Sequence, residues 1–255
     1  GNCEAVIGRI PAGKTIRVGT KYHPSLPGGP VAQMEQTLTA LQRDMNLWHG
    51  MAAADTLKKA QELYEGKAIT YPRTDSRYLT SDMQSAMPQL FRALEKSFPE
   101  AIGRLDLDKL SSSSRIFADK KVTDHHAIIP TGRPPSGSAD RRVYDAIAIR
   151  TIAAFYPPCK KDVTLVEASV GDVKFRARGV RVTDPGWTVL KAKPKRESEP
   201  DESEQELPPL EVGESGEHKP EIKKGETRPP QHYTESTLLA AMETAGKLVE
   251  DEQLK

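Results

Sequence analysis

The sequence of 255 residues lacks the features that mark several classes of protein. Its two cysteines, Cys3 and Cys159, are too few for a disulfide framework and do not lie at a zinc-ligand spacing. No apolar run approaches the roughly 20 residues that a membrane helix needs. The opening residues lack the basic and then apolar pattern of a signal peptide. We therefore expect a cytoplasmic protein, in a reducing compartment, that is not associated with a membrane.

A glycine-rich loop of the Walker type is also missing, so the usual phosphate cradle of an ATP-dependent enzyme is not expected. The net charge is only +1, but residues 197–255 contain 16 Asp and Glu against 6 Lys and Arg. The rest of the chain is correspondingly basic. A basic body with an acidic end is compatible with binding to a polyanion. A solvated surface followed by a charged linker would have the same composition.

Hydrophobic periodicity predicts a helical block between two strand-rich parts of the chain. Thr234 is a suitable N-cap for the last helix. The helix that ends at Gly66 has an apolar face, Leu57, Ala60, Leu63 and Tyr64, which we expect to be buried. The predicted helices cover residues 33–50, 52–66, 82–98, 139–155 and 233–246, and the predicted strands cover residues 3–10, 14–20, 162–170, 173–182, 186–190, 210–214 and 219–227.

Strands on both sides of the helical block predict an α+β fold, in which a helical domain is inserted in a discontinuous antiparallel β-domain. The β-domain is expected in residues 1–31 and 162–225, with a flexible acidic linker at 193–209 that is rich in Glu, Ser and Pro. The helical domain is expected at 32–161. Residues 226–255 are expected to begin a further helical domain.

The stretch AITYPRTDSRYLT has the residue types of a nucleophile that attacks a phosphodiester. A phenol has a reference pKa near 10 and is a poor nucleophile unless its anion is stabilised. Arg73, two positions after Tyr71, has a permanent charge and can bind phosphate oxygens. Pro72 stiffens the link between them, and the hydroxyls of Thr70 and Thr74 can contact neighbouring phosphates. A tyrosine that ends a strand beside a solvent-facing arginine would give the same pattern without this chemistry.

Two further clusters are ambiguous by pattern. The stretch TDHHAIIPT pairs His125 with His126, but no other ligand stands at zinc spacing, which favours ordinary core histidines. The stretch RPPQHYTE leads into a predicted helix N-terminus, whose free amides suit an anion or are simply capped.

The three clusters YPRTDSRYL, DHHAIIPT and PPQHYTESTLLAAME, in this order, resemble the type IA DNA topoisomerases. The stretch LQRDMNLWHGMAAADTLKKAQELYEGKAITYPRTDSRYLT is similar to the segment that leads to the active-site tyrosine of the family, and VYDAIAIRTIAAFYPP and PGWTVL are similar to later segments. The proline after the tyrosine and the double histidine resemble the bacterial topoisomerase III branch. The resemblance extends over nearly the whole chain.

This resemblance implies that Tyr71 attacks single-stranded DNA and forms a 5′-phosphotyrosyl bond, while Arg73 stabilises the tyrosinate and the transition state. A second strand would then pass through a gate formed by the β-domain, which relaxes or decatenates DNA without ATP. The resemblance further assigns DNA contacts to His125, Thr70, Thr74 and Thr234, and it places Gln61 and Glu65 on a helix close to the same site.

The metal-binding acidic (toprim) domain of the family has no counterpart in this sequence. We therefore expect Mg²⁺ only in the complete enzyme, bound by that domain, and none in this chain. Cleavage by the chain alone should be very weak. The expected partner is single-stranded DNA, and the expected state is a nucleoid-associated monomer.

Three other functions are compatible with parts of the sequence. A non-catalytic DNA-binding or scaffold module would use the same basic surface without the nucleophile. A tyrosine recombinase needs several arginines and histidines before a late tyrosine, whereas Tyr71 is early and the paired histidines follow it. A protein–protein module built on the sheet and the acidic linker has no specific support.

Overall fold

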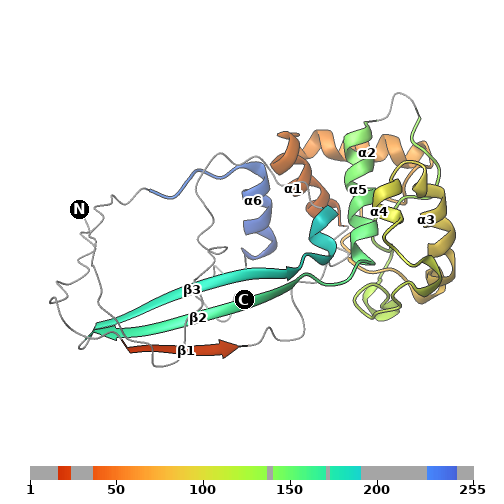
Figure 1. Cartoon of the computed structure of the whole chain (residues 1–255). Helices are drawn as coiled ribbons and strands as arrows, with labels where there is room; N and C mark the ends of the chain where they lie inside the picture. The colour runs from red at the N-terminus through yellow and green to blue at the C-terminus, as the bar shows by residue number, and fades with distance from the viewer. Residues whose placement is uncertain (1–16, 24–36, 137–139, 171–172, 191–228, 246–255) are drawn as a thin grey trace. The chain divides into compact units, whose positions relative to one another are not determined.

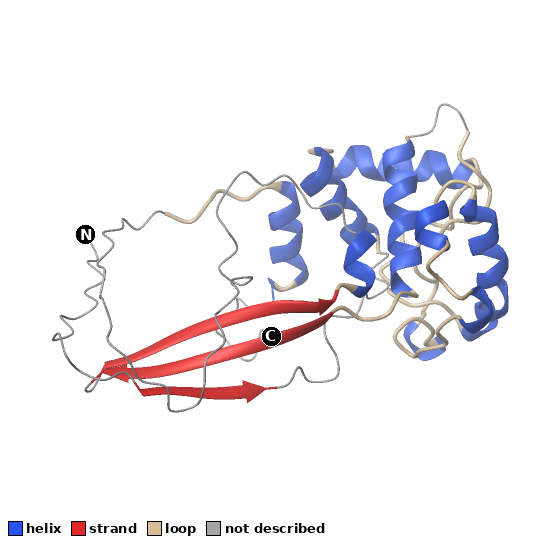
Figure 2. Cartoon of the chain, in the orientation of Figure 1, coloured by secondary structure: helices blue, strands red, loops and turns tan. Residues whose placement is uncertain are grey.

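The computed structural model describes residues 17–23, 37–136, 140–170, 173–190 and 229–245. The chain divides into two compact units, one built on strands and one on helices (Figure 2). The predicted strands 3–10, 210–214 and 219–227 and the predicted linker 193–209 lie outside the described residues. The strand unit falls within residues 1–30, 158–185 and 196–231, and the helical unit within 31–157, 186–195 and 232–255.

The strand unit contains a three-stranded antiparallel sheet in the order β1-β2-β3 (Figure 1). The strands are β1 (Arg17–His23), β2 (Lys160–Val170) and β3 (Val173–Asp184). Strand β1 pairs with β2 from Arg17 opposite Ser169 to His23 opposite Val163, although the helical block separates them in sequence. The prediction of helices with a small antiparallel sheet is confirmed. Residues 17–20 of the predicted strand 14–20 belong to β1, and residues 14–16 lie outside the described residues.

The predicted strand at residues 186–190 is wrong, because this segment forms the 3-10 turn η4 (Gly186–Leu190) of the helical unit. Pro185 has no amide hydrogen to continue a sheet, and Gly186 adopts a positive φ of 49° that favours glycine. The Trp187 amide donates a hydrogen bond to the Pro157 carbonyl (3.1 Å). Trp187 and Leu190 then pack against the hydrophobic core of the helical unit.

The helical unit begins with two helices whose ends follow from local sequence. The Thr37 hydroxyl caps α1 by accepting a hydrogen bond from the Ala40 amide, and Gly50 ends this helix with a positive φ of 61°. The predicted helix 82–98 is divided into η1 and α3, with Pro88 in the first turn of α3. The helices are α1 (Leu38–His49), α2 (Ala53–Glu65), α3 (Met87–Glu95), α4 (Pro99–Ile102), α5 (Arg141–Ala154) and α6 (Glu235–Glu243), with 3-10 turns η1 (Ser81–Ala86), η2 (Leu107–Lys109) and η3 (Asp119–Lys121).

Helix α5 supplies the largest share of the buried helical surface, from Val143 to Ala154. It contacts α1, α2 and α4. Arg150 on α5 forms an ion pair with Asp44 on α1. At its end, the Phe155 ring packs edge-on against Phe91, with centroids 5.0 Å apart. None of the helices among the described residues has the length and apolar character needed to cross a membrane.

The expected buried face of α2 is partly wrong. Ala60 and Leu63 are buried as predicted, but Tyr64 is 38% exposed and Thr56 is fully buried in its place. The Thr56 hydroxyl is satisfied locally, because it donates to the Ala52 carbonyl at 3.0 Å. The buried stripe therefore runs through positions i, i+4 and i+7 from Thr56, which rotates Tyr64 to the surface.

Asp140 caps α5 and links it to α2. Its carboxylate accepts hydrogen bonds from the Arg142 backbone and guanidinium, and it lies 2.9 Å from Lys59 Nζ. The hydrogen bond from Arg142, assisted by Lys59, holds the pKa of Asp140 well below its ordinary value. The ionised carboxylate therefore stabilises the folded state above the unfolded pKa near 4, and this contribution decreases as the pH falls below that value.

We predict that Asp140→Ala lowers the free energy of unfolding by about 1 kcal/mol at about pH 7. The difference in the free energy of unfolding between the variant and the wild type should be smaller at about pH 3, where the ionised carboxylate stabilises the wild type less. Urea unfolding of the whole chain, followed by tryptophan fluorescence at both pH values, measures this. Asp106→Ala, which removes the cap of only the three-residue turn η2, is the matched control. An equal loss in both variants would contradict the prediction.

Candidate active site

Two segments far apart in sequence form the candidate site: the tyrosine segment, residues 68–80, and the histidine segment, residues 122–132. They run antiparallel around a bridge between Ile69 and Pro130. Backbone hydrogen bonds fix one segment on the other over most of their length. These bonds join Thr70 N to Ile129 O (2.9 Å), Thr131 N to Ala68 O (3.0 Å) and Ala127 N to Tyr78 O (2.9 Å).

Two threonine hydroxyls strengthen this pairing. Thr70 Oγ1 accepts a hydrogen bond from the Ile129 amide at 3.0 Å. Thr74 Oγ1 donates to the His125 carbonyl at 3.0 Å and accepts from the Ser76 amide at 3.1 Å. Thr74 is also buried. The predicted site residues Thr70 and Thr74 are thus brought to the site, where their hydroxyls bind protein backbone groups.

The Tyr71 ring is half-buried and lies between two other rings. The His125 ring is tilted at 44° with its centroid 4.4 Å from that of Tyr71, and His125 itself is exposed. The Tyr64 ring approaches edge-on, with centroids 5.4 Å apart and an interplanar angle of 79°. Edge-to-face and tilted pairs at such separations are favourable contacts. The phenol of Tyr71 is therefore held in place by ring packing from α2 and from the histidine segment.

Tyr64 is a site residue that sequence reasoning missed. Its helical spacing from Ala60 and Leu63 assigned it to the core, but its ring is exposed beside Tyr71. The signal that could have identified it is its position at the last turn of α2, just before the tyrosine segment. Gln61 and Glu65 are four residues apart and share one face of α2, where Gln61 Nε2 donates to Glu65 Oε1 at 3.2 Å.

Arg73 is exposed and forms no ion pair with another residue in the described part of the chain. Pro72 beside it is buried, so the backbone that carries the guanidinium is anchored while its side chain reaches solvent. A guanidinium in this state is available to an anion from outside, which it can bind bidentately.

A second exposed cation, Lys121 of η3, lies against Tyr78 of the tyrosine segment. Lys121 Nζ is 3.1 Å from Tyr78 Oη and 4.6 Å from the centre of the Tyr78 ring. Arg77, Arg115 and Lys120 are also exposed. The surface of the tyrosine segment is therefore rich in groups that attract anions.

Thr234 is the one predicted site residue that the structure places elsewhere in the helical unit. It caps α6 in a capping box with Thr237, and its hydroxyl accepts from the Thr237 amide at 3.2 Å. This end of α6 contacts the beginning of α2, because the Ala53 amide donates to Glu235 at 2.7 Å. Tyr71 instead packs at the other end of α2, about 16 Å away at a rise of 1.5 Å per residue.

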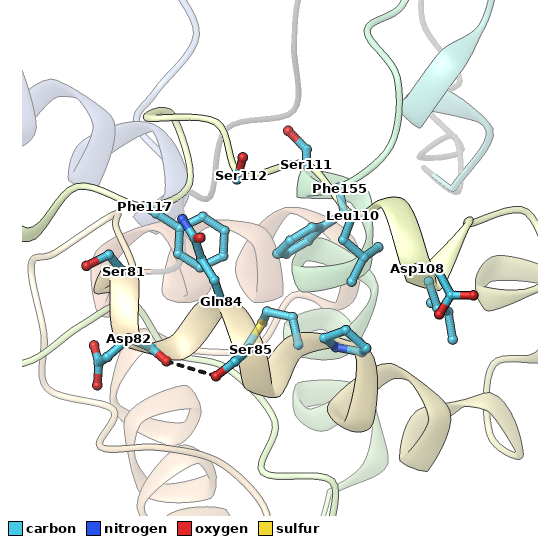
Figure 3. Close-up of a pocket in the computed structure, with 13 residues that line it drawn as sticks. Ser81, Asp82, Gln84, Ser85, Asp108, Leu110, Ser111, Ser112, Phe117 and Phe155 are labelled. Carbon is cyan, nitrogen blue, oxygen red and sulfur yellow. Dashed lines mark hydrogen bonds between the residues drawn. The ribbon is translucent and has the colours of Figure 1, made fainter.

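A pocket of about 500 Å³ lies apart from these residues, and none of the predicted site residues lines it. Figure 3 shows Phe117 and Phe155 within it, between the loop that bears Ser111 and Ser112 and the turn that bears Gln84. Among the described residues, no group of three or more His, Cys, Asp or Glu side chains is arranged to hold a metal ion.

Comparison with known proteins places this geometry in context. The profile of the family described as DNA topoisomerase matches residues 32–246. The chain is 35% identical over 223 residues to DNA topoisomerase 3 of Bacillus licheniformis and 38% identical over 232 residues to that of Shouchella clausii. These alignments cover 85% and 86% of this chain but 31% of each relative. The chain therefore spans about a third of the length of these curated relatives.

A solved structure, the full-length topoisomerase I of Thermotoga maritima, has a similar fold. The TM-score is 0.60 at 21% sequence identity, over 91% of this chain and 38% of that one. At this identity the match shows a shared fold of helices and antiparallel strands.

We predict that Thr74→Val lowers the free energy of unfolding by about 1–3 kcal/mol, because the His125 carbonyl and the Ser76 amide lose their partner in a buried position. Thr80→Val is the control, since the Thr80 side chain makes no capping hydrogen bond. Urea unfolding gives the stability, and the NMR shifts of the His125 ring report its position. Equal losses in the two variants would show that Thr74 does not hold the histidine segment.

Proposed function

The chain belongs to the DNA topoisomerase family, and we propose that it is the tyrosine and gate portion of a type IA enzyme that cleaves and rejoins one DNA strand. The resemblance read from the sequence motifs is confirmed at the level of the family. The observation that supports the activity is the half-buried Tyr71 ring held between Tyr64 and His125, with the exposed Arg73 on the same segment.

In the proposed reaction, Tyr71 Oη attacks a phosphodiester of single-stranded DNA. A bond forms between phosphorus and Oη, the bond to the 3′-oxygen breaks, and that oxygen takes up a proton while the phenol gives one up. Exchange of one phosphate ester for another needs no external energy source. Arg73 would bind the non-bridging phosphate oxygens, whose charge increases in the transition state.

His125, Thr70 and Thr74 would act by holding Tyr71 and the histidine segment in place. The His125 ring packs on the nucleophile, and its backbone is held by Thr74. Its exposed face is available to the DNA strand. Since Thr70 and Thr74 already bind protein backbone groups, we expect them mainly to fix the segments, with any DNA contact made through a remaining lone pair or proton.

The helical unit would be the tyrosine domain, inserted in a gate domain to which the sheet belongs. The support is the pairing of β1 with β2, because these strands come before and after the helical block. A gate must open while the cut strand stays tethered, and hinge motion suits the points where the chain crosses between the units. Thr234 would contact the DNA backbone from the N-terminus of α6, and residues 226–255 would lead into a further domain.

Mg²⁺, which the family implies, does not fit the described residues, since they offer no cluster of acidic ligands. We propose that any such ion is held by a part of the enzyme outside this chain. The chain by itself should therefore bind single-stranded DNA and cleave it very poorly.

The first test replaces the matching third of the Bacillus subtilis DNA topoisomerase 3 relative by this chain. We predict that the chimera forms a covalent adduct with labelled single-stranded DNA, and that Tyr71→Phe abolishes the adduct but keeps DNA binding. Denaturing gels measure the adduct, and fluorescence anisotropy measures binding. An adduct of normal yield in the Phe variant would refute the role of Tyr71. Binding with no adduct in either protein would favour a non-catalytic DNA-binding module.

The second test concerns Tyr64 in the same chimera. An aromatic pair contributes about 0.5–1.5 kcal/mol, so Tyr64→Ala should slow cleavage on the order of threefold to tenfold. Tyr64→Phe keeps the ring and should cleave at the wild-type rate. Single-turnover cleavage kinetics distinguish the two variants, with DNA affinity measured in parallel. If both variants behaved alike, ring packing from Tyr64 would not position the nucleophile.

A further inference from the structure

Two arginines from different segments converge on one carboxylate at the end of α6. Glu243 Oε2 lies 2.7 Å from Nη1 of Arg43 on α1, and Glu243 Oε1 lies 3.9 Å from Nη2 of Arg77 in the tyrosine segment. The three side chains are 38%, 25% and 45% exposed for Arg43, Glu243 and Arg77. The cluster is therefore open to solvent and joins the tyrosine segment to both helices.

The carboxylate does not satisfy this cluster fully. The buried Nε of Arg43 has no hydrogen-bond partner. Glu243 also lies in the last turn of α6, where the helix dipole disfavours a negative charge. Exposed ion pairs of this kind contribute only about 0–1 kcal/mol. A competing anion with more oxygen acceptors can therefore replace Glu243 at little cost.

Loss of the carboxylate contact would leave α6 attached at its other end. The Ser236 amide donates to Asn46 Oδ1 at 3.0 Å, and Glu235 accepts from the Ala53 amide at 2.7 Å. The backbone around Arg77 is also fixed, because Ser76 Oγ accepts from the Tyr78 amide at 3.2 Å. The backbone that carries each arginine would thus keep its position when Glu243 moves.

We propose that Arg43, next to Arg77, binds a phosphate of single-stranded DNA at the place that Glu243 occupies when DNA is absent. The ligand rests on the proposed function, since the strand held at Tyr71 supplies the phosphate. Arg77 is six residues from Tyr71, and six residues reach at most about 20 Å. The site therefore binds the same strand a few nucleotides from the cleaved bond. A phosphate offers more acceptor oxygens to the guanidinium of Arg43 than the carboxylate of Glu243 does.

The test measures binding of a labelled single-stranded oligonucleotide to the whole chain by fluorescence anisotropy at low salt. Glu243→Gln should tighten binding roughly twofold to fivefold, because the competing charge is gone. Glu95→Gln, which removes the same charge from the exposed surface of α3, should have a smaller effect. Arg43→Ala should weaken binding and reduce the salt dependence by about one phosphate contact.

The double variant isolates the site. In the Arg43→Ala background, Glu243→Gln should tighten binding no more than Glu95→Gln does, because the arginine that it competes for is missing. If Glu243→Gln had no larger effect than Glu95→Gln, or weakened binding, the ion pair would only hold α6 and the inference would be wrong. That result would leave the Tyr71 adduct intact. If the chimera formed no Tyr71 adduct but the affinities changed as expected, the proposed function would be wrong and the phosphate site would still be supported.

Discussion

The candidate site depends on the pairing of the tyrosine segment with the histidine segment. The two are distant in sequence, as shown by the Thr70 hydroxyl and the Ala127 carbonyl, which lie 57 residues apart along the chain. Neither segment belongs to a helix or a long strand, so its backbone groups must find partners elsewhere. They find them in each other, and the threonine hydroxyls bind the groups that remain. Tyr71 and His125 are consequently held in contact without metal or disulfide.

The helices contribute rigidity to this arrangement. Helix α2 presents Tyr64 at its last turn, at the edge of the buried stripe that Ala60 and Leu63 anchor in the core. Because α5 packs against α1 and α2, a change in the core would be transmitted to the ring contact at Tyr71. The tyrosine is thus positioned by packing, and a positive charge on the same segment is supplied by the exposed side chain of Arg73.

Local signals in the sequence predicted most of the elements. The N-cap Thr234, the helix end at Gly50 and the two long strands after the helical block were all correct. The segment 186–190 was wrong because alternating apolar residues suit a short turn packed on a core as well as a strand. The order of strands around the helices predicted a sheet with distant parts, but its register depends on contacts that no local pattern encodes.

The site was predictable only in part. Pattern alone favoured a core role for the paired histidines, and the family resemblance was needed to bring His125 to Tyr71. Tyr64 was assigned to the core because helical periodicity does not distinguish a residue on the boundary of the buried stripe from one inside it. Its partner, Tyr71, follows a change of chain direction after Gly66, and propensity cannot predict that geometry.

The partners of the arginines separate structural from functional charge. Arg150 pairs with Asp44 and ties α5 to α1, whereas Arg142 pairs with Asp140 and stabilises the N-terminus of α5 itself. Arg73 has no such partner among the described residues, although it lies on the best-anchored part of the chain. An exposed arginine that has no ion pair contributes little to the stability of the fold, since its side chain stays solvated. It contributes most to the binding of a charged ligand, because the backbone that carries it has already lost its conformational freedom on folding. That difference is the physical reason to assign Arg73 to an external phosphate and the other two to the scaffold.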